Sequence, residues 1–172
     1  QTCALPIWYV EKDEVLNFRD FQITPFEVPH DGSDNVGYCI EHDGKCFCFI
    51  TDIGHITSTV ASYIERANYL ILEANYDEEM LAHGPYPQYL KERIMGPNGH
   101  LSNKEAAKFL AQNLTEHLKC IWLCHLSREN NHPELAYKTV EWELRGVGAI
   151  PGKDFYLAAL KRTTPSELFE FE

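Results

Sequence analysis

The sequence lacks several features that would each define a class of protein. No apolar run approaches the roughly 20 residues needed to span a bilayer, so we expect no membrane-spanning segment. No charged start followed by an apolar stretch and a small-residue cleavage site is visible, so we expect a cytoplasmic chain. No G-x-S-x-G word occurs, and the nucleophile elbow of the serine hydrolases is therefore absent.

Basic residues are scarce. The chain has 15 Lys and Arg against 26 Asp and Glu, for a formal net charge of −11. This balance argues against broad electrostatic binding of nucleic acid, which depends on Lys and Arg neutralising phosphates. It does not exclude a nucleic-acid substrate, because bound metal ions would place positive charge at the point of reaction.

The six cysteines form no C-x-x-C pair. Cys46 and Cys48 alternate within an apolar run and should point to one face of a strand, while Cys120 and Cys124 flank another apolar run. Buried free thiols behave as small hydrophobic groups. We therefore expect core thiols in a reducing compartment, not a disulfide framework or a zinc finger.

A length of 172 residues suits one domain with a hydrophobic core. The first half is expected to be strands, and the second half to alternate helices with short buried strands. Ser102 and Glu105 predict a capping box at the start of one helix. The expected strands are 21–28, 36–41, 46–51, 69–72, 120–123 and 155–160, and the expected helices are 57–66, 77–82, 87–94, 103–118 and 133–146.

Three expected strands end in residues that can bind a metal. His30 follows Val28-Pro29, Asp52 follows the strand ending at Thr51, and His125 follows Cys124. Imidazole nitrogen and carboxylate oxygen are suitable ligands for zinc. Taken singly, such a histidine is more often a hydrogen-bonded structural residue, and such an aspartate is often a helix cap.

The order of these residues and the short sequence motifs around them resemble those of the metallo-β-lactamase superfamily, and more narrowly those of its YycJ/WalJ-type branch. These motifs are Thr51-Asp52-Ile53-Gly54, Glu73-Ala74-Asn75-Tyr76-Asp77, Gly99-His100-Leu101-Ser102 and His125-Leu126-Ser127-Arg128-Glu129-Asn130-Asn131. The resemblance extends from Phe18 to about Arg162. Branches that process tRNA 3′ ends or cleave phosphodiesters are also similar.

The resemblance implies a site with two divalent metal ions, zinc first, with manganese or iron as alternatives. His30 takes the place of a ligand of the first metal, and His125 that of a ligand of the second. Asp52 takes the place of the carboxylate that bridges both metals and is essential for catalysis. Two such metals activate water and clamp the scissile group.

Two further residues acquire roles by the same resemblance. His100 takes the place of a histidine that donates a proton to the leaving oxygen, although it could instead only form local hydrogen bonds before the Ser102 cap. Glu73 takes the place of a carboxylate that orients a histidine, although a solvated acid at a strand end is the plain alternative. His55 is expected at the rim of the site and not as a ligand.

The chain departs from the family in one large respect. The family's first motif, His-x-His-x-Asp-His, is absent, and no H-x-H occurs anywhere. We therefore interpret residues 8–172 as the C-terminal half of the domain, an α/β mixed sheet with helices on its outer face, half of a four-layer αββα sandwich. Residues 1–7 can be encoded by a string that resembles a sequencing adapter, and we interpret them as non-native; an ordinary N-terminal strand is the alternative.

The function implied is metal-dependent hydrolysis of phosphodiester bonds, with nucleic acid as the first substrate and this chain inactive alone. Hydrolysis of a small phosphodiester or another ester is the alternative within the enzymes. A non-catalytic fragment or binding module is the alternative outside them. The sequence indicates no oligomeric state.

Overall fold

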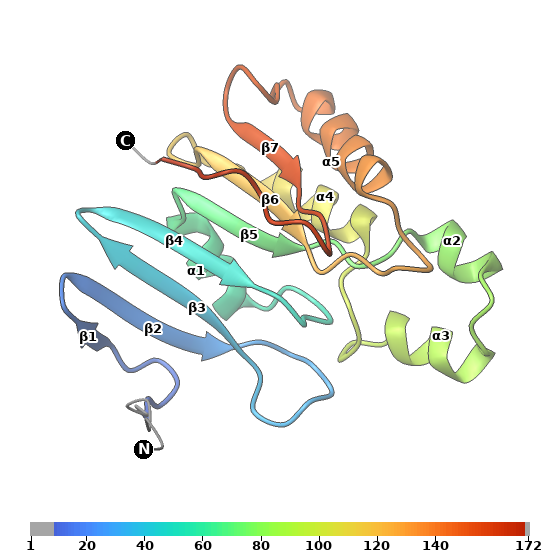
Figure 1. The fold of residues 1–172 in the computed structure, drawn as a ribbon, viewed down its shortest axis with the longest axis horizontal. Helices are drawn as coiled ribbons and strands as arrows, with labels where there is room; N and C mark the ends of the chain where they lie inside the picture. The colour runs from blue at the N-terminus through green and yellow to red at the C-terminus, as the bar shows by residue number, and fades with distance from the viewer. Residues whose placement is uncertain (1–8, 171–172) are drawn as a thin grey trace.

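The computed structural model describes residues 9–170, so the interpretation of residues 1–7 as non-native lies outside the described part. One mixed sheet of seven strands follows the chain in order, from β1 to β7 (Figure 1). The strands are β1 Leu16–Phe18, β2 Phe21–Glu27, β3 Val36–His42, β4 Lys45–Ile50, β5 Tyr69–Glu73, β6 Cys120–Cys124 and β7 Tyr156–Ala159. The helices are α1 Ser58–Arg66, α2 Glu78–His83, α3 Gln88–Met95, α4 Asn103–Asn113 and α5 Pro133–Gly146.

The sheet changes character at β4. Strands β1 to β4 form an antiparallel meander, whereas β4 to β7 are parallel to their neighbours. Because β2 and β4 are both antiparallel to β3, β2 runs in the same direction as β4 and the parallel strands. Five strands therefore end at one edge of the sheet, which is where α/β folds place their chemistry.

Helices α1, α4 and α5 cover one face of the sheet (Figure 1). Their apolar residues, among them Val60, Leu110 and Val140, join buried strand residues in one core cluster. The expected α/β architecture, a mixed sheet with helices on one outer face, is confirmed. No helix in residues 9–170 is long and apolar enough to cross a membrane.

The opposite face of the sheet is aromatic. Phe49 and Tyr38, paired across β4 and β3, expose 38% and 41% of their surfaces. Phe47 and Trp122 stack on the same face with ring centroids 6.0 Å apart. The C-terminal segment crosses this face (Figure 1), and its Phe169 ring lies 5.0 Å from that of Trp122. Burial of such rings would be favourable, so this face has the composition of a sheet that packs against another layer.

The core thiols are confirmed within the described residues. Cys39, Cys46 and Cys48 are buried under the helices, and the Sγ atoms of Cys39 and Cys46 lie 3.0 Å apart as free thiols. Burial raises the pKa of the Cys48 thiol, which keeps it protonated and unreactive.

Two sequence predictions differ from the structure. Strand β1 was not expected, and the helix predicted to reach Leu118 ends at Asn113. Asn68 explains the early end, because its side chain donates to the His117 carbonyl and its own carbonyl accepts from the Lys119 amide. These bonds draw the chain after α4 into the extended path that starts β6. The capping box of Ser102 and Glu105 is confirmed.

Candidate metal centre

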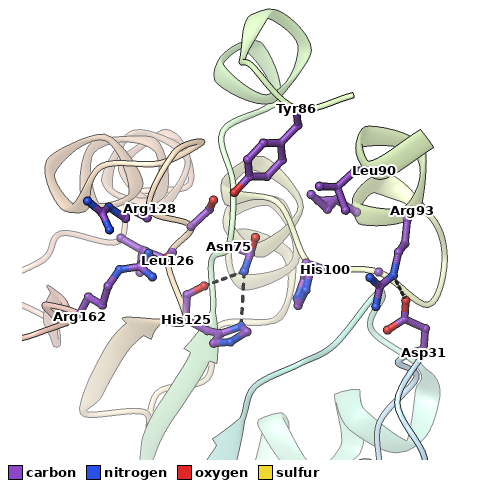
Figure 2. Close-up of a pocket in the computed structure, with 13 residues that line it drawn as sticks. Asp31, Asn75, Tyr86, Leu90, Arg93, His100, His125, Leu126, Arg128 and Arg162 are labelled. Atoms are coloured by element: carbon purple, nitrogen blue, oxygen red, sulfur yellow. Dashed lines mark hydrogen bonds and ion pairs between the residues drawn. The ribbon is translucent and has the colours of Figure 1, made fainter. Parts of the chain in front are cut away.

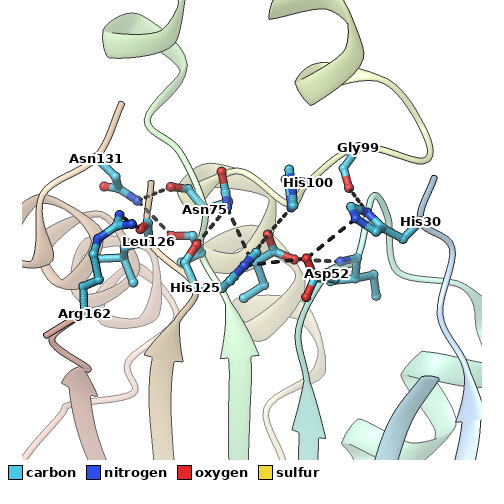
Figure 3. A network of polar contacts seen from close by, with 12 residues as sticks. His30, Asp52, Asn75, Gly99, His100, His125, Leu126, Asn131 and Arg162 are labelled. Carbon is cyan, nitrogen blue, oxygen red and sulfur yellow. Dashed lines mark hydrogen bonds and ion pairs between the residues drawn. The ribbon is translucent and has the colours of Figure 1, made fainter. Parts of the chain in front are cut away.

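The three residues expected as ligands meet at the end of the sheet. His30 lies just beyond β2, Asp52 just beyond β4 and His125 just beyond β6 (Figure 3). Asp52 Oδ1 lies 3.6 Å from His30 Nε2 and 3.6 Å from His125 Nε2. The carboxylate therefore stands between two imidazoles that are far apart in sequence.

The backbone at two of these positions is unusual. Asp52 has a φ of 53° and His125 a φ of 54°, both in the left-handed region that favours glycine. A non-glycine residue in this conformation costs about 1–2 kcal/mol. The sharp turn directs each side chain across the strand end, so the backbone strain is located at the two residues that approach each other in the candidate site.

His30 is oriented by a backbone carbonyl. Its Nδ1 donates to the Gly99 carbonyl at 2.8 Å, which leaves Nε2 as the lone-pair nitrogen facing Asp52. The neighbouring Gly54 amide donates to the Pro29 carbonyl at 2.7 Å. The loops that carry His30, Asp52 and His100 are thus bonded to one another.

Glu73, at the end of β5, orients the other two histidines. It is fully buried, and its Oε1 accepts from His100 Nδ1 at 2.6 Å and from His125 Nδ1 at 3.1 Å. Its Oε2 accepts from the Ile53 amide at 2.7 Å, in the loop that carries Asp52. One buried carboxylate therefore sets the position of both histidines and of the Asp52 loop.

The pKa values of this group reflect the same contacts. Burial would raise the pKa of Glu73, but the hydrogen bonds from His100 and His125 outweigh it, and the pKa lies below its ordinary value. The hydrogen bond to Glu73 raises the pKa of the His125 imidazole, against the effect of burial. Glu73 is therefore an ionised acceptor at neutral pH.

The donor set fits a metal. In His30, His100 and His125 the Nδ1 atom is engaged by an oxygen acceptor, so the Nε2 atom of each is left for a ligand, as in protein metal sites. The described residues include two groups of three side chains whose potential ligand atoms lie within 4.8 Å of one another. One group is His30, Asp52 and His100, and the other is Glu73, His100 and His125. Among the described residues, His100 belongs to both groups, and Asp52 shares a group with His30.

Sequence reasoning overlooked a layer of asparagines. Asn75 donates to the His125 carbonyl at 2.7 Å, and the buried Asn131 donates to the carbonyls of Ala74 and Asn75 (Figure 3). These bonds hold the turn after β6 against the turn after β5. A sequence signal for them was available, because Asn75 and Asn131 lie within two of the motifs that carry the family resemblance, and Asn75 closely follows a buried strand.

A cavity of about 350 Å³ opens beside the histidines. Its lining includes His100 and His125, the arginines Arg93, Arg128 and Arg162, and Tyr86 (Figure 2). Sequence reasoning assigned no role to these arginines or to Tyr86, which come from three separate segments. His55 lies on the surface, where its Nδ1 contacts the Pro97 carbonyl at 2.7 Å, as expected for a rim residue.

Comparison with known proteins gives the same family. Residues 1–120 match the family described as beta-lactamase superfamily domain. Exodeoxyribonuclease WalJ of Streptococcus pneumoniae is 36% identical over 160 residues, which are 93% of this chain and 60% of the relative. Exodeoxyribonuclease YycJ of Bacillus anthracis is 33% identical over 155 residues, 90% of this chain and 59% of the relative. The chain thus spans about 60% of the length of these curated relatives.

Solved structures agree on the fold. The metallo-beta-lactamase fold protein YhfI from Bacillus subtilis superposes with a TM-score of 0.59 at 16% identity, over 88% of this chain and 52% of that one. Igni18, a metallo hydrolase from Ignicoccus hospitalis, superposes with a TM-score of 0.59 at 13% identity, over 95% of this chain and 60% of that one. Sequence and sheet order agree: the chain is similar to the YycJ/WalJ-type relatives, and it belongs to the metallo-β-lactamase superfamily.

Proposed function

We propose that this chain is part of a metal-dependent hydrolase that cleaves phosphodiester bonds of nucleic acid. The observation that carries the proposal is the convergence of two imidazole Nε2 atoms, those of His30 and His125, on Asp52, beside a cavity lined by arginines. The names of the two relatives, both exodeoxyribonucleases, support DNA as the substrate class. The buried thiols favour a reducing compartment, so we place the protein in the cytoplasm.

The metal site would use residues from three strand ends. His30 would bind one divalent metal, His125 a second, and Asp52 both, since its Oδ1 is equally far from the two Nε2 atoms. When bound, such a metal pair supplies Lewis-acid activation of water and of the scissile phosphate. Nitrogen and carboxylate ligands favour zinc, with manganese or iron as alternatives.

His100 is the proposed proton donor to the leaving oxygen. Its Nδ1 is hydrogen-bonded to Glu73. The proton that His100 would deliver to the leaving oxygen is therefore the one on Nε2, because that nitrogen is not engaged by Glu73. Glu73, which accepts from Nδ1, keeps the ring in one orientation. Glu73 is therefore a positioning residue that acts through His100 and His125.

The complete ligand set would need residues that this chain lacks. No H-x-H occurs in it, whereas the family's His-x-His-x-Asp-His motif contributes most of the metal ligands. We propose that this motif belongs to an N-terminal half that packs on the aromatic face of the sheet. The chain alone, with at most part of each metal's ligands, is expected to be inactive.

The test is hydrolysis by a completed protein, in which this chain follows an N-terminal half carrying the motif. End-labelled DNA and a generic phosphodiester would be incubated with the protein after chelation, and again after zinc or manganese is added back. We expect DNA cleavage that depends on added metal. A folded, metal-loaded protein that cleaves neither substrate would overturn the proposal, and cleavage of the generic substrate alone would favour a small phosphodiester.

A further inference from the structure

The cavity beside the histidines gathers positive charge on an acidic protein. The chain has six arginines, and three of them, Arg93, Arg128 and Arg162, line this one cavity although the net charge is −11. Its lining includes a single carboxylate, Asp31. Such a concentration of guanidinium groups in a cleft attracts an anion more strongly than the net charge suggests.

The three arginines are not equivalent. Arg93 forms an ion pair with Asp31, so its charge is already balanced. Arg162 donates to the Leu126 carbonyl, a neutral acceptor, and forms no ion pair with any of residues 9–170. Arg128 reaches only Glu129, at 3.6 Å, and its side chain is 82% exposed, so this pair contributes little. The free positive charge is therefore on the Arg128 and Arg162 side of the cavity.

The opposite wall of the cavity is aromatic and aliphatic. Tyr86 precedes α3 and directs its ring into the cavity, and Leu90 and Ile94 on α3 continue the wall (Figure 2). Tyr86 and Leu90 are only half-buried, so their apolar surfaces are available to a ligand. A planar base can stack on an aromatic ring of this kind whatever its identity.

We propose that this cavity binds a single deoxynucleotide unit of the substrate, with its phosphate at Arg128 and Arg162 and its base against Tyr86 and Leu90. The proposal rests on the proposed function, which makes the substrate a nucleic-acid strand. Arginine binds phosphate through paired N–H donors, which gives both affinity and orientation. Because His100 and His125 line the same cavity, the unit bound there would place an adjoining phosphodiester at the metal site.

The test is binding of deoxyadenosine monophosphate and of deoxyadenosine to the completed protein after its metal has been removed by chelation, measured by titration calorimetry. The monophosphate should bind at least about tenfold more tightly, since charge-assisted bonds to arginine are lost without the phosphate. Arg128→Ala should weaken monophosphate binding about tenfold and leave deoxyadenosine binding unchanged. Tyr86→Ala should weaken both ligands, because it removes the stacking surface.

Arg145→Ala is the matched control, because Arg145 lies on α5, is half-exposed in a pair with Glu141, and does not line the cavity. It should change neither affinity. Arg162→Ala could disturb the Leu126 turn, so Arg128→Ala, at an exposed side chain, decides the question. Equal binding of the two ligands, or unchanged monophosphate binding in Arg128→Ala, would overturn the proposal.

Failure of this subsite and failure of the proposed function are separable. A completed protein that cleaves DNA while Arg128→Ala has no effect on nucleotide binding would overturn the subsite alone. Phosphate-dependent binding in a completed, metal-loaded protein that hydrolyses nothing would support the subsite and overturn the hydrolase.

Discussion

His125 Nε2 and Asp52 Oδ1 lie 3.6 Å apart, although their strands, β6 and β4, are separated in the sheet by β5. The contact is possible because both residues turn inward over the end of β5, each with a left-handed backbone. The end of β5 carries Glu73, which accepts hydrogen bonds from His125 Nδ1 and from the Ile53 amide in the Asp52 loop. Left-handed turns and a buried carboxylate thus combine to bring two candidate ligands together.

Asp52→Ala should abolish hydrolysis by the completed protein more thoroughly than His100→Ala. Asp52 would contact both metals, whereas a proton donor typically contributes about 10²–10⁴-fold. Asp52→Ala should also lose metal, and His100→Ala should retain it. Turnover and elemental analysis of each variant would check this. If His100→Ala strips the metal, His100 is a ligand, as its place in both groups of potential ligand atoms would allow.

Glu73→Gln should destabilise the completed protein in its metal-free form by about 3 kcal/mol, because two histidines lose a buried, ionised acceptor. Urea denaturation followed by circular dichroism would measure the loss. Glu73→Asp, which keeps the charge on a shorter side chain, is the conservative comparison and should lose less.

The stabilisation by Glu73 should depend on pH. Because its pKa is lowered on folding, the contribution is complete above the ordinary value of 4.5 and is lost as pH falls through the lower folded value. The difference in unfolding free energy between the wild type and Glu73→Gln should therefore narrow below pH 4.5. A difference that stays constant down to the acid transition would show that Glu73 is not held ionised.

Gly99→Ala should displace the loop that carries His100. A Cβ at Gly99 would lie 2.2 Å from the Ile94 carbonyl oxygen, and the Gly99 carbonyl itself orients His30. We expect a loss of about 1–3 kcal/mol in stability and weaker metal binding. Gly146→Ala is the control, because nothing lies within 4 Å of its Cβ and helix α5 should tolerate or gain from alanine.

The chain alone should bind a hydrophobic dye and associate in solution. Phe49, Tyr38 and Phe21 are exposed on the strands by 38–41%, on the face opposite the helices. Packing of an N-terminal half on this face should remove the dye signal and give a cooperative melt. A monodisperse chain that binds no dye and melts cooperatively by itself would contradict the proposed half-domain.

The sequence predicted the elements that are long and strongly patterned. It marked His30, Asp52 and His125 as candidate ligands because their order and the motifs around them resemble the metallo-β-lactamase superfamily; their positions after apolar strands were a weak signal alone. It also predicted that Glu73 orients a histidine, but only the structure shows that it bonds to two. The left-handed turns at Asp52 and His125 have no sequence signature, since aspartate and histidine are ordinary at strand ends. The early end of α4 depends on Asn68, whose bonds with residues 117–119 are tertiary and invisible to local propensity.

The arginines of the cavity were missed for a similar reason. Arg93, Arg128 and Arg162 come from α3, the loop after β6 and the segment after β7, and nothing in their spacing shows that they meet. Only the sheet order and the packing of α3 over the strand ends bring them together. The family resemblance therefore marked the candidate ligands, whereas only the tertiary structure shows which arginines line the cavity beside them.

The most direct test of the metal centre is an anomalous-scattering map of the completed protein crystallised with zinc or manganese. We predict two peaks, about 3.5–4 Å apart, on either side of Asp52. One should lie about 2.0–2.2 Å from His30 Nε2 and the other at the same distance from His125 Nε2, with Asp52 bound to both. Metal bound elsewhere, with His30, Asp52 and His125 free of it in a folded protein, would contradict the account.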